Sequence, residues 1–381
     1  MSVSWATAKP ESLGTSGAHD VELKDSDLDA SVGPEIEQRS TFIIQDQIPL
    51  VLPEVQSRLA GSLALTGKDL VGTVAIGSQD FRIRFDTGSA DVWVTSTLCT
   101  SEVCKDKHKY NPGTFPEPPE TAELKYSDGS FVSGTIKTDT VNVAGVVATD
   151  QFLVAASTLS DQFLTKQYDG MIGMAMSRSR SGLNKDPFFI TAIKQQKDLS
   201  QVFAFKLSDP ASLYLGGTDK SLYTGEIEFH TLADSGPLWK LAVASVSVGS
   251  ERVLSGLRTI IDTGSDIILG PPSEVREFYS KIPGNEMCEE AGIEFYFFPC
   301  PPGETVPSVS FSWGEKSWHM SEDTFVRLKH TEDGVQSCLG NIAGRNFGYG
   351  EKVWLLGDPF LKNVYTIFSL EDDTLGFAAL K

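Results

Sequence analysis

The strongest constraint on this chain is a five-residue motif that occurs twice. An apolar residue followed by Asp-Thr-Gly-Ser stands at 85–89 and again at 261–265, 176 residues further along. Each copy follows a short apolar run typical of a buried strand, and each precedes an apolar pair that ends in glycine, at 171–173 and at 355–357. Similarity at so long a period indicates that one lobe has been duplicated.

From about Leu63 onward the sequence has the texture of a β protein. Residues 81–85 alternate strictly between apolar and basic side chains, as a half-buried strand does, and further strands are predicted at 70–77 and 133–143. Turn residues separate these short runs at intervals that favour an all-β sandwich or barrel arrangement over βαβ units. Helices are predicted to be few and short, at 188–193 with Asp186 as the N-cap, at 273–282 and at 359–363.

The length predicts two domains and an additional segment, because 381 residues exceed one ordinary core. The expected divisions are an acidic arm or divergent prosegment at 1–60, an N-terminal lobe at 61–220 and a C-terminal lobe at 221–381. The arm holds ten acidic and four basic residues and is predicted to be mostly flexible. Its apolar stretches at 42–44 and 48–52 are the exception, because they could form a docking strand.

Composition excludes several classes of function. The chain has 51 acidic and 32 basic residues, a net charge of −19, which argues against nucleic acid and against a polybasic membrane anchor. No apolar run approaches 18 residues, so no membrane-spanning helix is expected, and residues 1–17 lack the apolar core of a secretory signal. The five cysteines and five histidines form neither a CxxC pair nor an HExxH motif, so neither a metal site nor a cofactor is expected.

Two Asp-Thr-Gly motifs can support chemistry that one cannot. A lone copy is usually a surface turn, in which the aspartate caps its own backbone. Two copies, one per lobe, can bring Asp86 and Asp262 together, and carboxylates about 3 Å apart share one proton, so that one acts as a base and the other as an acid.

The other motif residues are predicted to hold the aspartates. The glycines let backbone N–H groups approach, the threonines bond across to the opposite loop, and the serines donate to the outer carboxylate oxygens. Plain turn chemistry is the alternative for the threonines and serines. The supporting residues are Thr87, Gly88, Ser89, Thr263, Gly264 and Ser265.

With these motifs in this order, the sequence resembles the pepsin-like aspartic endopeptidases over more than 300 residues, from about Leu65 to the C-terminus. The segments that carry the resemblance are FDTGSADVW at 85–93, YSDGS at 126–130, DGMIG at 169–173, LGGTDKSLYTG at 215–225, IIDTGSDIILGP at 260–271 and LGDPFLKNVYTIF at 356–368. The resemblance implies a bilobal all-β fold with a cleft between the lobes. It also implies peptide-bond hydrolysis in a peptide or protein substrate without metal or cofactor, a zymogen, a monomer, and a secreted or vacuolar location.

The resemblance also assigns roles to residues outside the two motifs. A flap around 124–132 would cover the cleft, with Tyr126 hydrogen-bonded to Trp93, and with Asp128 and Gly129 contacting the substrate backbone. Asp358 would either tune the acidity of the aspartate pair or serve a structural turn. The implied disulfides are Cys99–Cys104 and Cys300–Cys338, which leaves Cys288 as a free thiol, buried and inert by default, with an intermolecular bridge as the alternative.

The chain departs from the family pattern at several positions that bear on substrate preference and pH optimum. These are a short turn at 77–80, Ala90, Asp91, Ser127 and Asp266. Neither a signal peptide nor the usual basic prosegment is evident. A catalytically silent homologue that binds peptides is the competing hypothesis, and the intact aspartates, threonines, glycines and Tyr126 argue against it. A serine hydrolase is a more distant alternative because no GxSxG motif is present.

Overall fold

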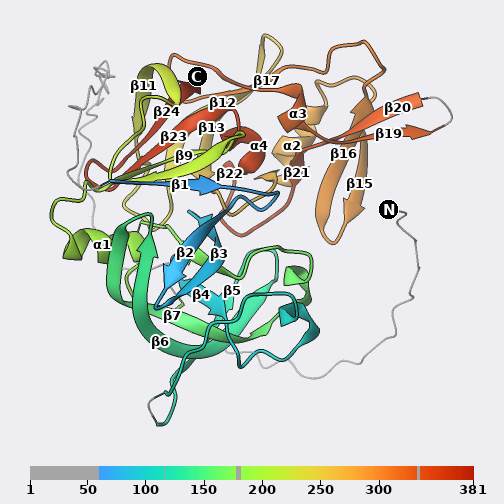
Figure 1. Cartoon of the computed structure of the whole chain (residues 1–381). Helices are drawn as coiled ribbons and strands as arrows, with labels where there is room; N and C mark the ends of the chain where they lie inside the picture. Colours follow the sequence, from blue (N-terminus) through green and yellow to red (C-terminus); the bar gives the residue numbers. More distant parts are fainter. Residues whose placement is uncertain (1–59, 116, 177–181, 333–334) are drawn as a thin grey trace, which may run out of the picture. The chain divides into compact units, whose positions relative to one another are not determined.

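The computed structural model describes residues 60–115, 117–176, 182–332 and 335–381 (Figure 1). The predicted arm, with its apolar stretches at 42–44 and 48–52, lies outside the described residues except for Ala60. The structure is about half strand and one tenth helix, which confirms the all-β prediction. All described residues belong to one compact unit. Their strands form three sheets.

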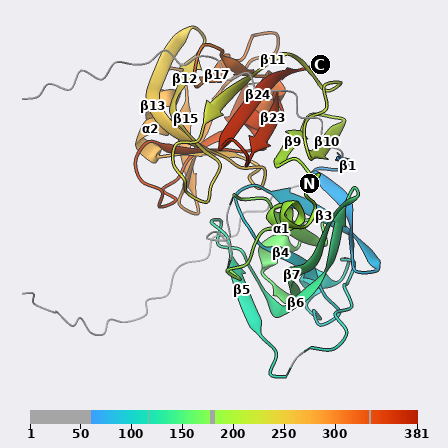
Figure 2. The ribbon, with the colours of Figure 1, turned by 90° about the vertical axis from the view of Figure 1, so that its left-hand side faces the viewer.

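The first sheet contains seven strands in the order β2-β3-β8-β4-β7-β6-β5. Its strands are β2 (Val71–Ile76), β3 (Gln79–Asp86), β4 (Val92–Thr95), β5 (Thr121–Lys125), β6 (Phe131–Val143), β7 (Val146–Leu159) and β8 (Gly170–Gly173). In Figures 1 and 2 these strands, blue to green, group together in the lower part of each view.

The second sheet contains eleven strands in the order β18-β17-β12-β13-β22-β14-β21-β16-β20-β19, with β15 paired to β16. Its strands are β12 (Lys240–Val248), β13 (Glu251–Ile261), β14 (Ile268–Gly270), β15 (Glu286–Glu290), β16 (Ile293–Pro299), β17 (Val309–Ser312), β18 (Trp318–Met320), β19 (Val326–Glu332), β20 (Val335–Gly340), β21 (Ile342–Gly344) and β22 (Val353–Leu356). They lie in the upper part of both views.

The third sheet draws strands from both halves of the chain and from its C-terminus. Its six strands run in the order β1-β10-β9-β23-β24-β11. They are β1 (Gly61–Leu65), β9 (Val202–Lys206), β10 (Ala211–Leu215), β11 (Tyr223–Thr231), β23 (Val364–Ser369) and β24 (Thr374–Leu380).

Helices are short throughout the described segments. The elements are η1 (Glu102–Cys104), η2 (Asp161–Phe163), α1 (Phe188–Gln195), α2 (Pro272–Tyr279), α3 (Glu322–Phe325) and α4 (Asp358–Leu361). Helices α1, α2 and α4 lie where the sequence places helices, but the predicted N-cap is wrong: Pro187 holds that position, and the Asp186 carboxylate instead accepts from Lys194 at 2.5 Å. No helix within the described ranges has the length and apolar character needed to cross a membrane.

The duplicated sequence motif corresponds to a duplicated strand arrangement. Strand β3, which ends in Asp86, pairs in parallel with β8, which carries the apolar pair and its glycine, and β8 pairs antiparallel with β4. Strand β13, which leads into Asp262, pairs in parallel with β22, and β22 pairs antiparallel with β14. The two motifs therefore emerge from equivalent places in two equivalent groups of three strands.

Strand β3 is half-buried over its first residues, as its alternation predicts, with Arg82 exposed, but its C-terminal end is buried on both faces. Phe81, Ile83 and Phe85 point into the core, as expected. On the opposite face Arg84 is only 5% exposed, because β2 and β8 flank the strand and the second motif covers its end. The alternation located the strand but did not predict that Arg84, on its polar face, is buried.

Candidate active site

Each motif folds into the same local turn. In the first motif loop (86–89) the Gly88 N–H donates to Oδ1 of Asp86 at 2.8 Å, and in the second motif loop (262–265) the Gly264 N–H donates to Oδ1 of Asp262 at 2.8 Å. A backbone donor at that distance favours the ionised form of a carboxyl group. The Asp-x-Gly spacing thus fixes each carboxylate against its own loop.

The two loops are joined through their threonines. The Thr87 hydroxyl donates to the carbonyl of Ile261 at 2.9 Å, and the Thr263 hydroxyl donates to the carbonyl of Phe85 at 2.9 Å. Each hydroxyl also accepts the backbone N–H of the opposite threonine, at 3.1 Å for Thr87 N and 3.0 Å for Thr263 N. These four buried hydrogen bonds form a closed two-fold set, so that neither loop can shift without breaking contacts in the other.

The carboxyl groups of Asp86 and Asp262 lie in direct contact across this axis. A Cβ atom added to Gly88 would stand 2.7 Å from Oδ2 of Asp262. A Cβ atom at Gly264 would collide with Oδ1 of Asp86. Glycine is therefore required at both positions because the opposite carboxyl group occupies the space of a side chain.

Burial and the adjacent Asp86 charge raise the pKa of Asp262 well above its usual value. Two ionised carboxylates in contact repel, so the pair retains one proton over a wide pH range. The environment favours placing that proton on Asp262, because Asp86 accepts a second hydrogen bond from the Ser89 hydroxyl, at 2.5 Å to Oδ2. The site thus combines one acid and one base.

The two serines differ, and the prediction for Ser265 is wrong. Its hydroxyl donates to the carbonyl of Ile267 at 2.9 Å and accepts from the Ile267 N–H at 3.4 Å, rather than donating to Asp262. The physical reason is local competition, because a serine side chain readily bonds the backbone two residues on. Ser89, by contrast, takes the predicted position.

The aspartate pair opens into a cavity of about 560 Å³ lined by both large sheets. Leu238, Ile260 and Leu355 form an apolar part of its wall. The β5–β6 hairpin, residues 123–130, forms another part of the wall. A cavity that combines apolar and charged lining residues suits an extended chain with side chains of mixed character.

The β5–β6 hairpin is the predicted flap. The Trp93 indole N–H donates to the Tyr126 hydroxyl at 2.8 Å, and burial together with the Asp86 charge raises the pKa of that hydroxyl. Gly129 takes a φ of 86° in the turn. The Asp128 carboxylate accepts from both the N–H and the hydroxyl of Ser130, at 2.9 Å and 2.6 Å. The hairpin is therefore held by Trp93 where its turn begins, at Tyr126, and by hydrogen bonds within the turn.

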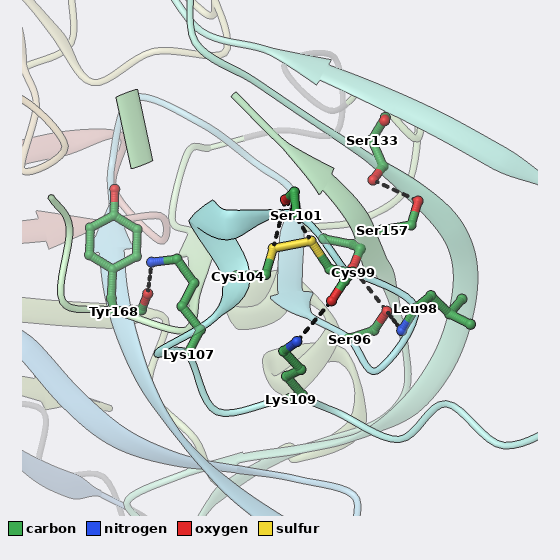
Figure 3. The surroundings of a disulfide bond; sticks show 11 residues. Ser96, Leu98, Cys99, Ser101, Cys104, Lys107, Lys109, Ser133, Ser157 and Tyr168 are labelled. Atoms are coloured by element: carbon green, nitrogen blue, oxygen red, sulfur yellow. Dashed lines mark hydrogen bonds between the residues drawn. A yellow bond between two sulfur atoms is a disulfide. The ribbon is translucent and has the colours of Figure 1, made fainter. Parts of the chain in front are cut away.

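Both predicted disulfides are present. Cys99–Cys104 closes a loop of the first sheet, in which Lys109 donates to the Cys99 carbonyl at 2.8 Å (Figure 3). Cys300–Cys338 joins the end of β16 to β20. The prediction that Cys288 is buried is wrong, because this thiol is exposed. Its strand, β15, pairs only with β16 in the described sheet, and all five residues of β15 are exposed.

Three acidic residues near the site have distinct surroundings. Asp91 accepts the Gly182 N–H at 2.7 Å and so anchors a loop. Asp266 is about half exposed and pairs with Arg327 at 4.0 Å. Asp358 is buried, and burial raises its pKa to about 6 against the attraction of Arg84 and Lys362. Among the described residues, no group of three or more His, Cys, Asp or Glu side chains is arranged to hold a metal ion.

Sequence reasoning missed Arg84, which lines the same cavity as both aspartates. The signal was available: Arg84 stands two residues before Asp86 on a strand, and residues two apart share a face.

Two β-rich halves that each contribute one Asp-Thr-Gly loop to a shared carboxyl pair define the aspartic protease class. Residues 69–380 match the family model described as eukaryotic aspartyl protease. The chain is 34% identical over 314 residues to an aspartic protease of Phaffia rhodozyma, covering 81% of this chain and 75% of that protein. It is 30% identical over 335 residues to cathepsin D of Homo sapiens, covering 81% and 79%. The chain belongs to the eukaryotic aspartyl protease family.

Proposed function

We propose that the chain is an active aspartic endopeptidase whose catalytic residues are Asp86 and Asp262. The observation that carries this proposal is the contact between the two carboxyl groups, held by the threonine set, with one proton retained by the pair. Proton sharing of this kind is general among aspartic proteases; the assignment to these two residues is the proposal for this chain.

In the reaction, the ionised Asp86 takes a proton from a water molecule that attacks the scissile carbonyl carbon. The protonated Asp262 gives its proton to the carbonyl oxygen, which produces a gem-diol without a covalent acyl-enzyme. The carboxyl pair then returns a proton to the leaving amine as the C–N bond breaks. Ser89 contributes by stabilising the charge on Asp86.

The substrate is a peptide in extended form, with apolar side chains preferred near the scissile bond. Support comes from the Leu238, Ile260 and Leu355 wall of the cavity. The flap residues Tyr126, Asp128 and Gly129 close on the peptide backbone and exclude water, as lids over active sites do. Activity is expected in acid, where the pair carries one proton.

The lobe boundaries remain 61–220 and 221–381. Support for this division is that the first sheet lies wholly within the first range and the second sheet wholly within the second, while the third draws on both. Residues 1–60 are proposed as a prosegment removed in acid, with the protein acting as a monomer. The two disulfides support a secreted or vacuolar location, since disulfides persist in oxidising compartments.

The test is cleavage of denatured haemoglobin or casein from pH 3 to 6, with and without pepstatin. Wild type should cleave in acid and be inhibited, whereas Asp86→Asn should be inactive. Asp80→Asn is the matched control, because Asp80 lies on the same strand but is exposed at its far end. N-terminal sequencing after acid treatment reports removal of the arm. A folded wild type that binds pepstatin but cleaves nothing at any pH would instead establish a silent peptide-binding homologue.

A further inference from the structure

A buried arginine stands beside the carboxyl pair. Arg84 and Asp86 lie two residues apart on β3 and so share a face, and the Arg84 side chain is 6% exposed. Arginine is almost never fully buried unless it is paired, because its charge cannot be removed by losing a proton. Its partners therefore indicate what it does.

The partners of Arg84 come from three separate parts of the chain. Its Nη2 atom donates at 3.2 Å to the carbonyl of Thr263, the residue directly after Asp262. Its Nη1 atom lies 3.9 Å from Asp69, in the turn before β2, and Nη2 lies 3.9 Å from Asp358 in α4. Arg84 thus links β3 to the second motif loop and to α4.

Other charged and titratable groups face this cluster and bear on its electrostatics. Tyr168 and Asp86 face Arg84, Lys166 lies 3.9 Å from Asp69, Lys362 lies 4.0 Å from Asp358, Asp266 acts on Asp358, and the Tyr126 hydroxyl faces Asp86.

We propose that Arg84 is a positioning residue of the aspartate pair, which holds the second motif loop through the Thr263 carbonyl and supplies the positive charge that extends the singly protonated state of the pair to lower pH. This rests on the proposed function, because it concerns the same two aspartates.

The sign follows from the charges. A cation favours the ionised form of a nearby carboxyl group, and Arg84 opposes the raised pKa of Asp262. Asp358 neutralises Arg84 only where it is itself ionised, and with a pKa of about 6 it is mostly uncharged below that pH. In acid, therefore, the positive charge of Arg84 is no longer neutralised by Asp358 and acts more strongly on the aspartate pair.

The experiment compares pH profiles of kcat/KM for wild type, Arg84→Met and Arg84→Lys. Loss of the charge should move the acidic limb of the profile upward by about one pH unit, given a charge several ångströms away in a partly polar interior. Arg84→Lys, which keeps the charge, should have an acidic limb close to that of wild type. Profiles of Arg84→Met that superimpose on wild type, or an equal shift in Arg84→Lys, would overturn the proposal.

Arg82→Met is the matched control. Arg82 lies on the same strand and face but pairs with Asp169 at 2.7 Å, and its side chain is 48% exposed. This variant should lose stability without moving the profile, and a shift as large as that of Arg84→Met would count against a specific role. If Arg84→Met does not fold, the double variant Arg84→Met/Asp358→Asn removes both buried charges, and its acidic limb should still move upward.

A readout that does not need catalysis separates this proposal from the proposed function. Carbon-13 NMR of the aspartate carboxyl groups, titrated from pH 2 to 8, follows the proton of the pair in the folded protein. If wild type cleaves no substrate, the proposed function fails, yet an upward shift of the titration in Arg84→Met would still support the role of Arg84. An unchanged titration would refute it whatever the activity.

Discussion

The two motif loops are alike where they touch each other and different where they face their own lobes. The threonine contacts are equivalent within 0.1 Å in the two directions, at 2.9 and 2.9 Å and at 3.1 and 3.0 Å. The serines have diverged, since Ser89 binds Asp86 and Ser265 binds the Ile267 carbonyl. The threonine contacts lie on the two-fold axis and must serve both loops at once, whereas the serine contacts lie off it and can differ. The difference between the serines makes the two aspartates chemically unequal.

The largest effect should come from the aspartates themselves. Asp86→Asn and Asp262→Asn should each lower kcat/KM by roughly 10³-fold or more, because each removes one partner of the acid–base pair. Asp262→Asn should also change the stability of the fold. The pKa of Asp262 is raised in the folded state, so its ionised form destabilises the fold at neutral pH, and Asp262→Asn should be more stable than wild type at pH 7. Urea unfolding at pH 4 and 7 measures this; a loss of stability at pH 7 would contradict it.

The threonines test the part of the comparison that is symmetric. Thr87→Val and Thr263→Val should each lower the free energy of unfolding by about 2 to 4 kcal/mol, because each leaves a buried carbonyl and a buried N–H without a partner. Thr→Ser at either position keeps the hydroxyl and serves as the control. The two valine variants should agree closely in urea unfolding, and clearly unequal losses would show that the contacts are not equivalent.

Asp358 tests a difference between the two halves. It directly follows Gly357, whereas Met174 follows the equivalent glycine of the first half, Gly173. With a folded pKa of about 6 against an ordinary value of 3.8, Asp358 holds its proton longer when folded, so stability falls as pH rises from about 4 to 6. Asp358→Asn should reduce the fall in unfolding free energy between pH 3 and 7 by up to roughly 3 kcal/mol. If the unfolding free energy of Asp358→Asn falls between pH 3 and 7 as much as that of wild type, Asp358 is not the group responsible for the fall.

The smallest effect should separate the two serines. Ser89→Ala removes a donor to Asp86 and should lower kcat/KM by roughly tenfold while moving the acidic limb of the pH profile upward. Ser265→Ala removes a bond to the backbone and should leave the profile in place. Matching shifts in the pH profiles of both variants would mean that the observed asymmetry does not govern the chemistry.

Local pattern was a good guide to the fold. Strict alternation located β3, proline and apolar spacing located α1 and α2, and the repeat anticipated two equivalent strand groups. The same pattern failed for Arg84, because alternation shows that two faces differ but not whether a second layer covers the polar one. It also failed for Cys288, because a cysteine is buried by default, whereas its strand lies at a sheet edge with every residue exposed.

The sequence by itself determined the all-β class and the pair of motif loops, and its resemblance to a known family implied the two disulfides. The class and the loops follow from spacing and residue type, which are properties of short segments and of their repetition. The tertiary structure alone decided that Ser89 and Ser265 bind different partners, that Arg84 is buried against Thr263, and that Asp358 lies close to it. Those outcomes depend on which backbone groups and charges arrive from distant parts of the chain, and side-chain hydrogen bonds and pKa values respond to neighbours in space.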